Sequence, residues 1–340
     1  MDWSGEFSRP VCLEITCMDI HQSVIDYLLT IPIFDVWHKM SAILRRVAST
    51  RPRDWKLPIL VYQAVGESPE KAIPASAALA CAQISIILVD DMLDKDPRGE
   101  YHRIGCGNAA NFAIAFQSAG MDALVGSRAN SKVKREASNS LNQMMLRTAH
   151  GQEMDIQNPA DETSYWHIVE NKSAPFYGCG FYLGALFGEA TDETAKGLER
   201  LGQLYGEMIQ IHDDLNDSMA VPANPDWLQR RKPLPILFAL SVDHPDRAKF
   251  LDLHQNILSQ NALQEAQEIL IRCGAVSYCV HQLLRRHQAA QEILNKLSLP
   301  NKGIVDSLVE VVIAPVWKLF ESLGVLPEIP STIERQTNLE

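Results

Sequence analysis

Apolar residues recur along this 340-residue chain at intervals of three and four positions, the period of an α-helix packed against a core. Thr191 and the two acidic residues after it are typical of a helix start, and the clearest apolar stripe follows them: Leu198, Leu201, Leu204, Met208, Ile211 and Leu215. Alternating apolar and β-branched runs, which would indicate strands, are scarce. The pattern therefore predicts an all-α fold.

A second apolar segment, at 75–89, ends directly in two aspartates. Ser68 and Pro69 are typical of a helix cap and first turn, and Pro74 predicts a kink or a new helix start before this segment. The segment has the length of a buried helix and is too short and interrupted to span a bilayer. No flexible linker, low-complexity tract or repeat divides the chain. We therefore expect one domain over 1–340, with a loose extension at about 1–20 and a tail at about 326–340.

Composition narrows the function classes. The chain is 46% hydrophobic and 21% charged, as globular proteins are, and its net charge of −11 argues against a nucleic-acid partner. Its seven cysteines form no CxxC pair, which argues against a zinc site or a disulfide framework. The first residues lack the basic region and apolar core of a signal peptide. We expect a cytoplasmic protein with reduced thiols and no integral membrane segment.

Two acidic motifs of the form Asp-Asp-x-x-Asp occupy positions 90–94 and 213–217. Because residues four apart share a helical face, Asp90 and Asp94 project together, and so do Asp213 and Asp217. Isolated acidic clusters are more often solvated helix ends, but here each motif continues an apolar helix and the motif occurs twice. Four converging carboxylates repel one another unless cations lie between them, and Mg²⁺ prefers carboxylates together with phosphate oxygens. The motifs predict a diphosphate bridged by magnesium.

Further elements lie around these motifs in a specific order. Gly-Gln-x-x-Asp occupies 151–155, Lys172 is followed by serine and alanine, Gln210 precedes the second motif, and Lys232 precedes a Leu-Pro turn. With these elements the chain resembles the polyprenyl synthetase (trans-isoprenyl diphosphate synthase) family of class I isoprenoid synthases, from about residue 50 to about residue 240.

The resemblance implies a helical bundle with a central active-site cavity, assembled as a homodimer. The implied substrate is an allylic isoprenyl diphosphate, and the implied cofactor is Mg²⁺, as three ions bound with the diphosphate. The implied metal ligands are Asp90, Asp94, Asp213 and Asp217. Lys172 and Gln210 take the catalytic positions, and the diphosphate is contacted by Arg98, Lys172 and Lys232. Cations at these places stabilise the charge that develops on the leaving diphosphate.

The chain of the substrate should lie below the metals, in a pocket lined by Leu79, Ala82, Ser85, Ile86 and Phe176. Family members that stop at short chains tend to carry aromatic residues at the positions that Ser85 and Ile86 occupy here. The smaller side chains of this sequence favour a C15–C20 substrate.

Two elements depart from the family. Chain-elongating members begin with a Gly-Gly-Lys-Arg-x-Arg-Pro element that holds isopentenyl diphosphate, and in the aligned stretch 52–58 Asp54 and Leu57 replace key cations. Arg98 stands alone where two arginines are expected. Since a second diphosphate needs several charge-assisted contacts, this site looks degraded. The leading expectation is therefore ionisation of the allylic diphosphate followed by terpene cyclisation or quenching.

Two other functions stay open at this point. Arg51, Arg53 or Lys56 could restore the acceptor site, which would make the protein a chain-elongating prenyltransferase or a transferase to another acceptor. The protein could also be a non-catalytic regulatory subunit of a prenyl synthase. The retained aspartates and Lys172 argue against that last function, because a scaffold has no reason to keep a costly cluster of negative charge.

Overall fold

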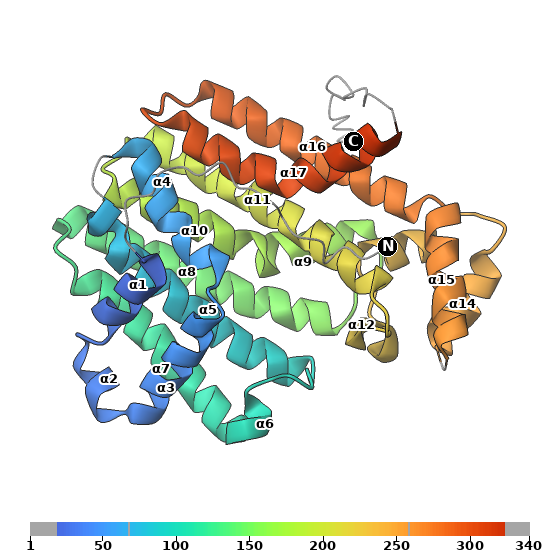
Figure 1. Ribbon diagram of the computed structural model, residues 1–340, viewed down its shortest axis with the longest axis horizontal. Coiled ribbons are helices and arrows are strands. Elements are labelled where there is room, and N and C mark those ends of the chain that lie inside the picture. The colour runs from blue at the N-terminus through green and yellow to red at the C-terminus, as the bar shows by residue number, and fades with distance from the viewer. Residues whose placement is uncertain (1–18, 67–68, 258, 324–340) are drawn as a thin grey trace, which may run out of the picture.

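A computed structural model describes residues 19–66, 69–257 and 259–323, and within these ranges it contains helices and no strand. The predicted all-α fold is confirmed (Figure 1). The predicted cap at Ser68, the tail at 326–340 and nearly all of the extension at 1–20 lie outside the described residues.

The helices in chain order are α1 (Ile20–Leu28), α2 (Pro32–Val36), α3 (His38–Ser49), the 3₁₀ helix η1 (Arg53–Lys56), α4 (Leu57–Val65), the 3₁₀ helix η2 (Pro69–Ala72), α5 (Ile73–Leu93), α6 (Tyr101–Ile104), α7 (Cys106–Val125), α8 (Ser131–Ile156), α9 (Glu162–Lys172), α10 (Ala174–Phe187), α11 (Asp192–Met219), α12 (Pro225–Gln229), α13 (Leu234–Ser241), α14 (Arg247–Gln255), α15 (Gln260–Arg272), α16 (Ala275–Lys296) and α17 (Lys302–Leu323).

The two helices that carry the aspartate motifs begin where the sequence predicts. The Thr191 side chain accepts a hydrogen bond from the backbone amide of Thr194 and caps α11, whose apolar stripe is buried. Pro74 lies in the first turn of α5, directly after η2, so a new helix starts there. The segment Glu70–Leu93 is long and apolar enough to cross a membrane by length and composition, but 72% of its apolar window is buried inside the protein. It is packed as a core helix.

Two clusters of buried side chains form the core. The larger one joins α5, α7, α10, α11 and α16, with the closest packing between α10 and α11 and between α5 and α7. The smaller one surrounds Trp227, Ile236 and Phe250 and joins α12 to α15, which lie together at one end of the molecule (Figure 1). The larger cluster fixes both aspartate motifs relative to each other, and the smaller one supports the loop after α12. The single-domain expectation stays a prediction.

Candidate active site

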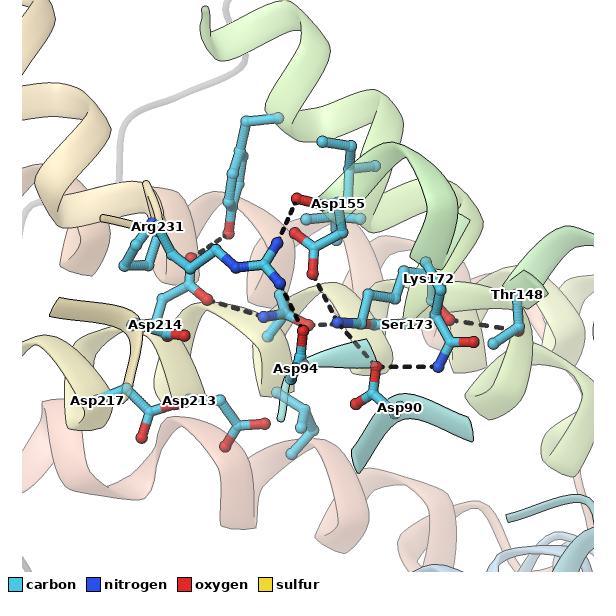
Figure 2. A pocket seen from close by; sticks show the side chains of 18 of the residues that line it. Asp90, Asp94, Thr148, Asp155, Lys172, Ser173, Asp213, Asp214, Asp217 and Arg231 are labelled. Carbon is cyan, nitrogen blue, oxygen red and sulfur yellow. Dashed lines mark hydrogen bonds and ion pairs between the residues drawn. The ribbon is translucent and has the colours of Figure 1, made fainter. Parts of the chain in front are cut away.

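A cavity of about 440 Å³ lies between the C-terminal ends of α5 and α11, as the all-α bundle with a central cavity predicts. The predicted site residues that line it are Asp90, Asp94, Asp213, Asp217, Lys172, Gln210, Lys232, Ile86 and Phe176. They come from α5, α9, α10, α11 and the loop after α12, so the tertiary structure brings together motifs that are over a hundred residues apart (Figure 2).

The first wall is the end of α5. The carboxylate of Asp90 accepts a hydrogen bond of 3.0 Å from the Gln152 side chain and lies 3.4 Å from the Lys172 ammonium. Asp94 accepts a hydrogen bond of 2.6 Å from the guanidinium of Arg231. Burial raises the pKa of Asp94, and the positive charges of Lys172 and Arg231 oppose that rise. Both carboxylates of this wall therefore have cationic neighbours.

Lys172 is the last residue of α9, and Pro175 in the first turn of α10 separates the two helices. Its ammonium lies 2.7 Å from Asp155, the last residue of the Gly-Gln-x-x-Asp motif (Figure 2). Burial alone would lower the pKa of Lys172, but Asp155, Asp90 and Asp94 raise it above its usual value. The side chain therefore stays charged at neutral pH.

The second wall is the end of α11. Asp213 has no hydrogen-bond donor or cation within the described residues, and Figure 2 shows it on the same side as Asp217. Its side chain is open to the cavity but protein surrounds it on most sides; this burial, together with Asp214, Asp217 and Asp54, raises its pKa to about 7. Burial also raises the pKa of Asp217. The positive charge of Arg98 opposes the rise at Asp217, whereas no cation opposes it at Asp213.

The middle carboxylate of the second motif is held in place by three donors. Asp214 is buried and accepts hydrogen bonds from the hydroxyl of Tyr165 (2.7 Å), the backbone amide of Leu234 (2.7 Å) and the amide of Gln210 (2.8 Å). The hydroxyl of Ser173 in turn donates to Gln210. Asp214 thus joins α9, α11 and the start of α13, and it fixes the orientation of Gln210 beside the cavity.

The charges of the lining fit a divalent cation. Among the described lining residues, seven carboxylates face three cationic side chains. No group of three His, Cys, Asp or Glu side chains in the described ranges converges closely enough to bind an ion by itself. Carboxylates on two facing walls suit Mg²⁺, which takes one or two carboxylates and completes its shell with water and phosphate oxygens. The donor set therefore fits magnesium bound together with a diphosphate.

Arg231, Asp226 and Tyr165 are among the lining residues that the sequence reasoning missed. Arg231 contacts Asp94 and donates a hydrogen bond of 2.8 Å to the backbone oxygen of Asp155, whereas the expected Lys232 donates to the backbone oxygen of Pro159 at 3.4 Å. In the sequence, the three consecutive basic residues at 230–232 indicated a cation at this place. Their spacing did not indicate which of the three side chains faces the cavity. Asp226 and Tyr165 carried no motif signal.

Four predicted site residues do not line this cavity. Arg98 is 84% exposed and pairs with Asp96 at 2.7 Å. Leu79, Ala82 and Ser85 are buried in the packing of α5, and Leu79 contacts α10 at Gly180. Their roles in diphosphate and chain binding stay predictions.

The stretch aligned with the acceptor element lies beside the cavity. Asp54 accepts a hydrogen bond of 2.7 Å from the side chain of Gln83, a lining residue that also accepts one of 2.8 Å from Trp55. Burial raises the pKa of Asp54. Arg51 does not line the cavity, and its guanidinium pairs with the carboxylate of Asp19 at 3.0 Å. A carboxylate thus stands close to the place where the resemblance implies cations.

Comparisons with known proteins identify similar sequences. Residues 50–270 match the family model described as polyprenyl synthetase. A geranylgeranyl diphosphate synthase of Methanosarcina mazei is 28% identical over 58% of this chain and 64% of its own length. A short chain isoprenyl diphosphate synthase of Methanothermobacter thermautotrophicus is 26% identical over 71% of this chain and 78% of its own length. The match thus spans less than two thirds of the length of the first relative.

Solved structures show the same fold. A geranylgeranyl pyrophosphate synthetase from Pyrococcus horikoshii superposes with a TM-score of 0.75 at 19% identity, covering 86% of this chain and 93% of that one. A decaprenyl diphosphate synthase from Rhodobacter capsulatus also gives a TM-score of 0.75, at 14% identity, with 88% and 94% covered. At these identities the likeness concerns the fold alone.

Proposed function

Because this chain belongs to the polyprenyl synthetase family, we propose that it is a Mg²⁺-dependent prenyltransferase that joins an allylic isoprenyl diphosphate to isopentenyl diphosphate. One observation carries the proposal: Asp90 and Asp94 face Asp213 and Asp217 across a cavity that Lys172, Arg231 and Lys232 also line. The relatives favour this chain-elongating alternative over the cyclisation that the sequence put first, because their names are those of prenyl diphosphate synthases.

Magnesium would be held by Asp90 and Asp94 on one wall and by Asp213 and Asp217 on the other, and it would neutralise the charge of the diphosphate. The number of ions, three, is carried over from the family. Lys172 and Arg231 lie where they can donate hydrogen bonds to the leaving diphosphate as negative charge develops on it. Since charge-assisted contacts strengthen with that charge, they favour the transition state over the bound substrate.

In the proposed reaction the bond between carbon 1 and the diphosphate oxygen breaks, and the diphosphate leaves with the electron pair. The double bond of isopentenyl diphosphate then forms the new carbon–carbon bond, and the acceptor loses a proton to the released diphosphate, which restores a double bond. The apolar part of the lining shields the cation from water and includes Ile86, Ile87, Ile168, Val169, Phe176 and Ile209. A C15–C20 allylic chain and a homodimeric assembly belong to this proposal.

A second candidate has one observation in its favour. The carboxylate of Asp54 and its partner Gln83 stand beside the cavity, where a second diphosphate would be repelled rather than bound. In this case the allylic cation would cyclise or be quenched by water, without isopentenyl diphosphate.

One experiment separates the two candidates. The protein is incubated with Mg²⁺ and geranyl, farnesyl or geranylgeranyl diphosphate, with and without isopentenyl diphosphate, and products are identified by mass spectrometry. Longer diphosphates formed only when isopentenyl diphosphate is present support the prenyltransferase. Hydrocarbons or alcohols formed from the allylic substrate alone support the second candidate. Absence of turnover under both conditions would contradict both and would point to a regulatory subunit.

A further inference from the structure

A second cleft lies next to the catalytic cavity and measures about 980 Å³. Its walls come from α13, α14, the loop after α12 and Ala160, which precedes α9. Lys232 lines both this cleft and the catalytic cavity. The two spaces are therefore neighbours that share one cationic side chain.

Among the described residues that line the cleft, cationic side chains outnumber carboxylates. Arg230, Lys232 and Arg247 line it, while Asp243 is the one carboxylate among its described lining residues. Arg247 donates to the backbone oxygen of Leu240 at 2.9 Å and Lys232 to that of Pro159, and neither pairs with an acid in the described residues. In a chain with a net charge of −11, three cations without acidic partners around one cleft indicate an anion-binding surface.

The backbone that presents these cations is held firmly. His254 is buried and its ring nitrogen hydrogen-bonds the backbone oxygen of Arg231 at 3.1 Å, while His244 bonds that of Ala239 at 2.9 Å. Apolar side chains complete the walls, and they are Leu237, Leu240, Ala248 and Leu251. The cleft thus offers planar guanidinium groups and an ammonium beside an apolar surface.

We propose that this cleft is a second binding site for a diphosphate group, separate from the catalytic cavity, with Arg230, Lys232 and Arg247 as its cations. The choice of diphosphate among anions rests on the proposed function, because the shared Lys232 adjoins the cavity where that group is released. The diphosphate could be the free inorganic ion or the head of an isoprenyl diphosphate, whose tail would lie on the leucines.

The two sites differ in whether they need magnesium to bind a diphosphate. In the catalytic cavity seven carboxylates face three cations, so a diphosphate is repelled there unless metal is present. In the cleft the cations outnumber the one described carboxylate, so the same anion needs no metal. Binding of diphosphate in the presence of EDTA therefore reports on the cleft.

The test is isothermal titration of the full chain, in EDTA at low salt, with inorganic diphosphate and separately with geranyl diphosphate. We expect saturable binding, weakened about tenfold by Arg247→Ala and by Arg230→Ala, as the loss of one charge-assisted contact implies. Lys249→Ala is the matched control, because Lys249 lies two residues from Arg247 on α14 but pairs with Glu265 and does not line the cleft. It should leave the affinity unchanged.

Lys172→Ala, which alters only the catalytic cavity, should also leave metal-free binding unchanged. Tighter binding of geranyl diphosphate than of the inorganic ion supports a site for the isoprenyl form, and equal binding supports a site for the free ion. Absence of metal-free binding, or binding that both arginine variants leave intact, overturns the proposal. Failure of the proposed function is visible separately, as a lack of turnover with Mg²⁺ while metal-free binding persists.

Discussion

The ammonium of Lys172 lies 2.7 Å from the carboxylate of Asp155, which joins the end of α9 to the Gly-Gln-x-x-Asp motif at the end of α8. The backbone allows this contact at Gly151, one turn before Asp155. A Cβ atom at position 151 would lie 2.3 Å from the backbone nitrogen of Lys172, far inside the contact distance of real Cβ atoms. The glycine of the motif therefore sets how closely α8 and α9 approach and where Lys172 points.

This relationship predicts the effect of Gly151→Ala. The added methyl group must push α9 away and displace the Lys172 ammonium, so we expect kcat to fall by about 100-fold, as a misplacement near 1 Å implies. The measurement is steady-state release of diphosphate. Gly303→Ala is the control, since a Cβ at that position on α17 meets no atom within 4 Å. Normal turnover by the Gly151 variant would show that the close approach is not needed.

Asp213→Asn should abolish metal-dependent turnover, with kcat reduced by orders of magnitude, because it removes a carboxylate that no protein cation neutralises. The same change should raise the melting temperature of the metal-free protein, since the repulsion of the Asp213 carboxylate by Asp214, Asp217 and Asp54 disappears. Differential scanning fluorimetry in EDTA measures this. Glu193→Gln, on the exposed first turn of α11, is the control for both readouts. A variant that keeps turnover would remove Asp213 from the metal site.

The stability of the metal-free protein should depend on pH. The pKa values of Asp213 and Asp226 are raised by burial to about 7, above the unfolded value of 3.8. Between about pH 4 and pH 7 the folded state binds more protons at these two groups than the unfolded state does. Their contribution to the free energy of unfolding is therefore highest below about pH 4 and falls as pH rises through 7. Thermal unfolding in EDTA between pH 5 and pH 8 measures this fall. Mg²⁺ should raise the melting temperature more at pH 8 than at pH 5, and the reverse order would contradict the assignment.

Arg231 should matter more for catalysis than Arg98. Arg231→Ala removes the side chain that contacts Asp94 at 2.6 Å inside the cavity, and we expect kcat/KM to fall about 10- to 100-fold. Arg98→Ala removes an exposed side chain paired with Asp96, so we expect a smaller loss. Steady-state kinetics on both variants compares them. An equal loss would mean that Arg98 turns into the cavity when substrate binds.

Glu189→Gly should stabilise the fold without touching the site. Glu189 follows α10 with a left-handed φ of 55°, and the next residue, Ala190, donates its backbone amide to Ala185. This arrangement favours glycine, because a side chain in the left-handed region costs about 1 kcal/mol. Urea denaturation should show that gain for Glu189→Gly and none for Glu189→Ala. A gain with both variants would indicate a cause other than backbone conformation.

The sequence by itself determined the helices and the direction of the aspartates along them. On any helix, a spacing of four residues places Asp90 beside Asp94 and Asp213 beside Asp217. The cap at Thr191 and the proline at 74 determined where those helices begin. These are local properties, because backbone periodicity and end effects act within a few residues. The order of motifs also predicted the family that the comparisons show.

Only the tertiary structure decided which neighbouring side chains enter the cavity. Arg230 has a left-handed φ of 57°, which turns the chain so that Arg231 contacts Asp94, although all three residues of 230–232 are basic. Ser85 precedes Ile86 by one residue, yet Ser85 is buried in packing and Ile86 lines the cavity. The rotation of a helix about its axis and the conformation of a loop depend on packing between distant segments. The periodicity of the sequence therefore predicts which residues share a helix face, and only the packing of neighbouring helices decides what that face contacts.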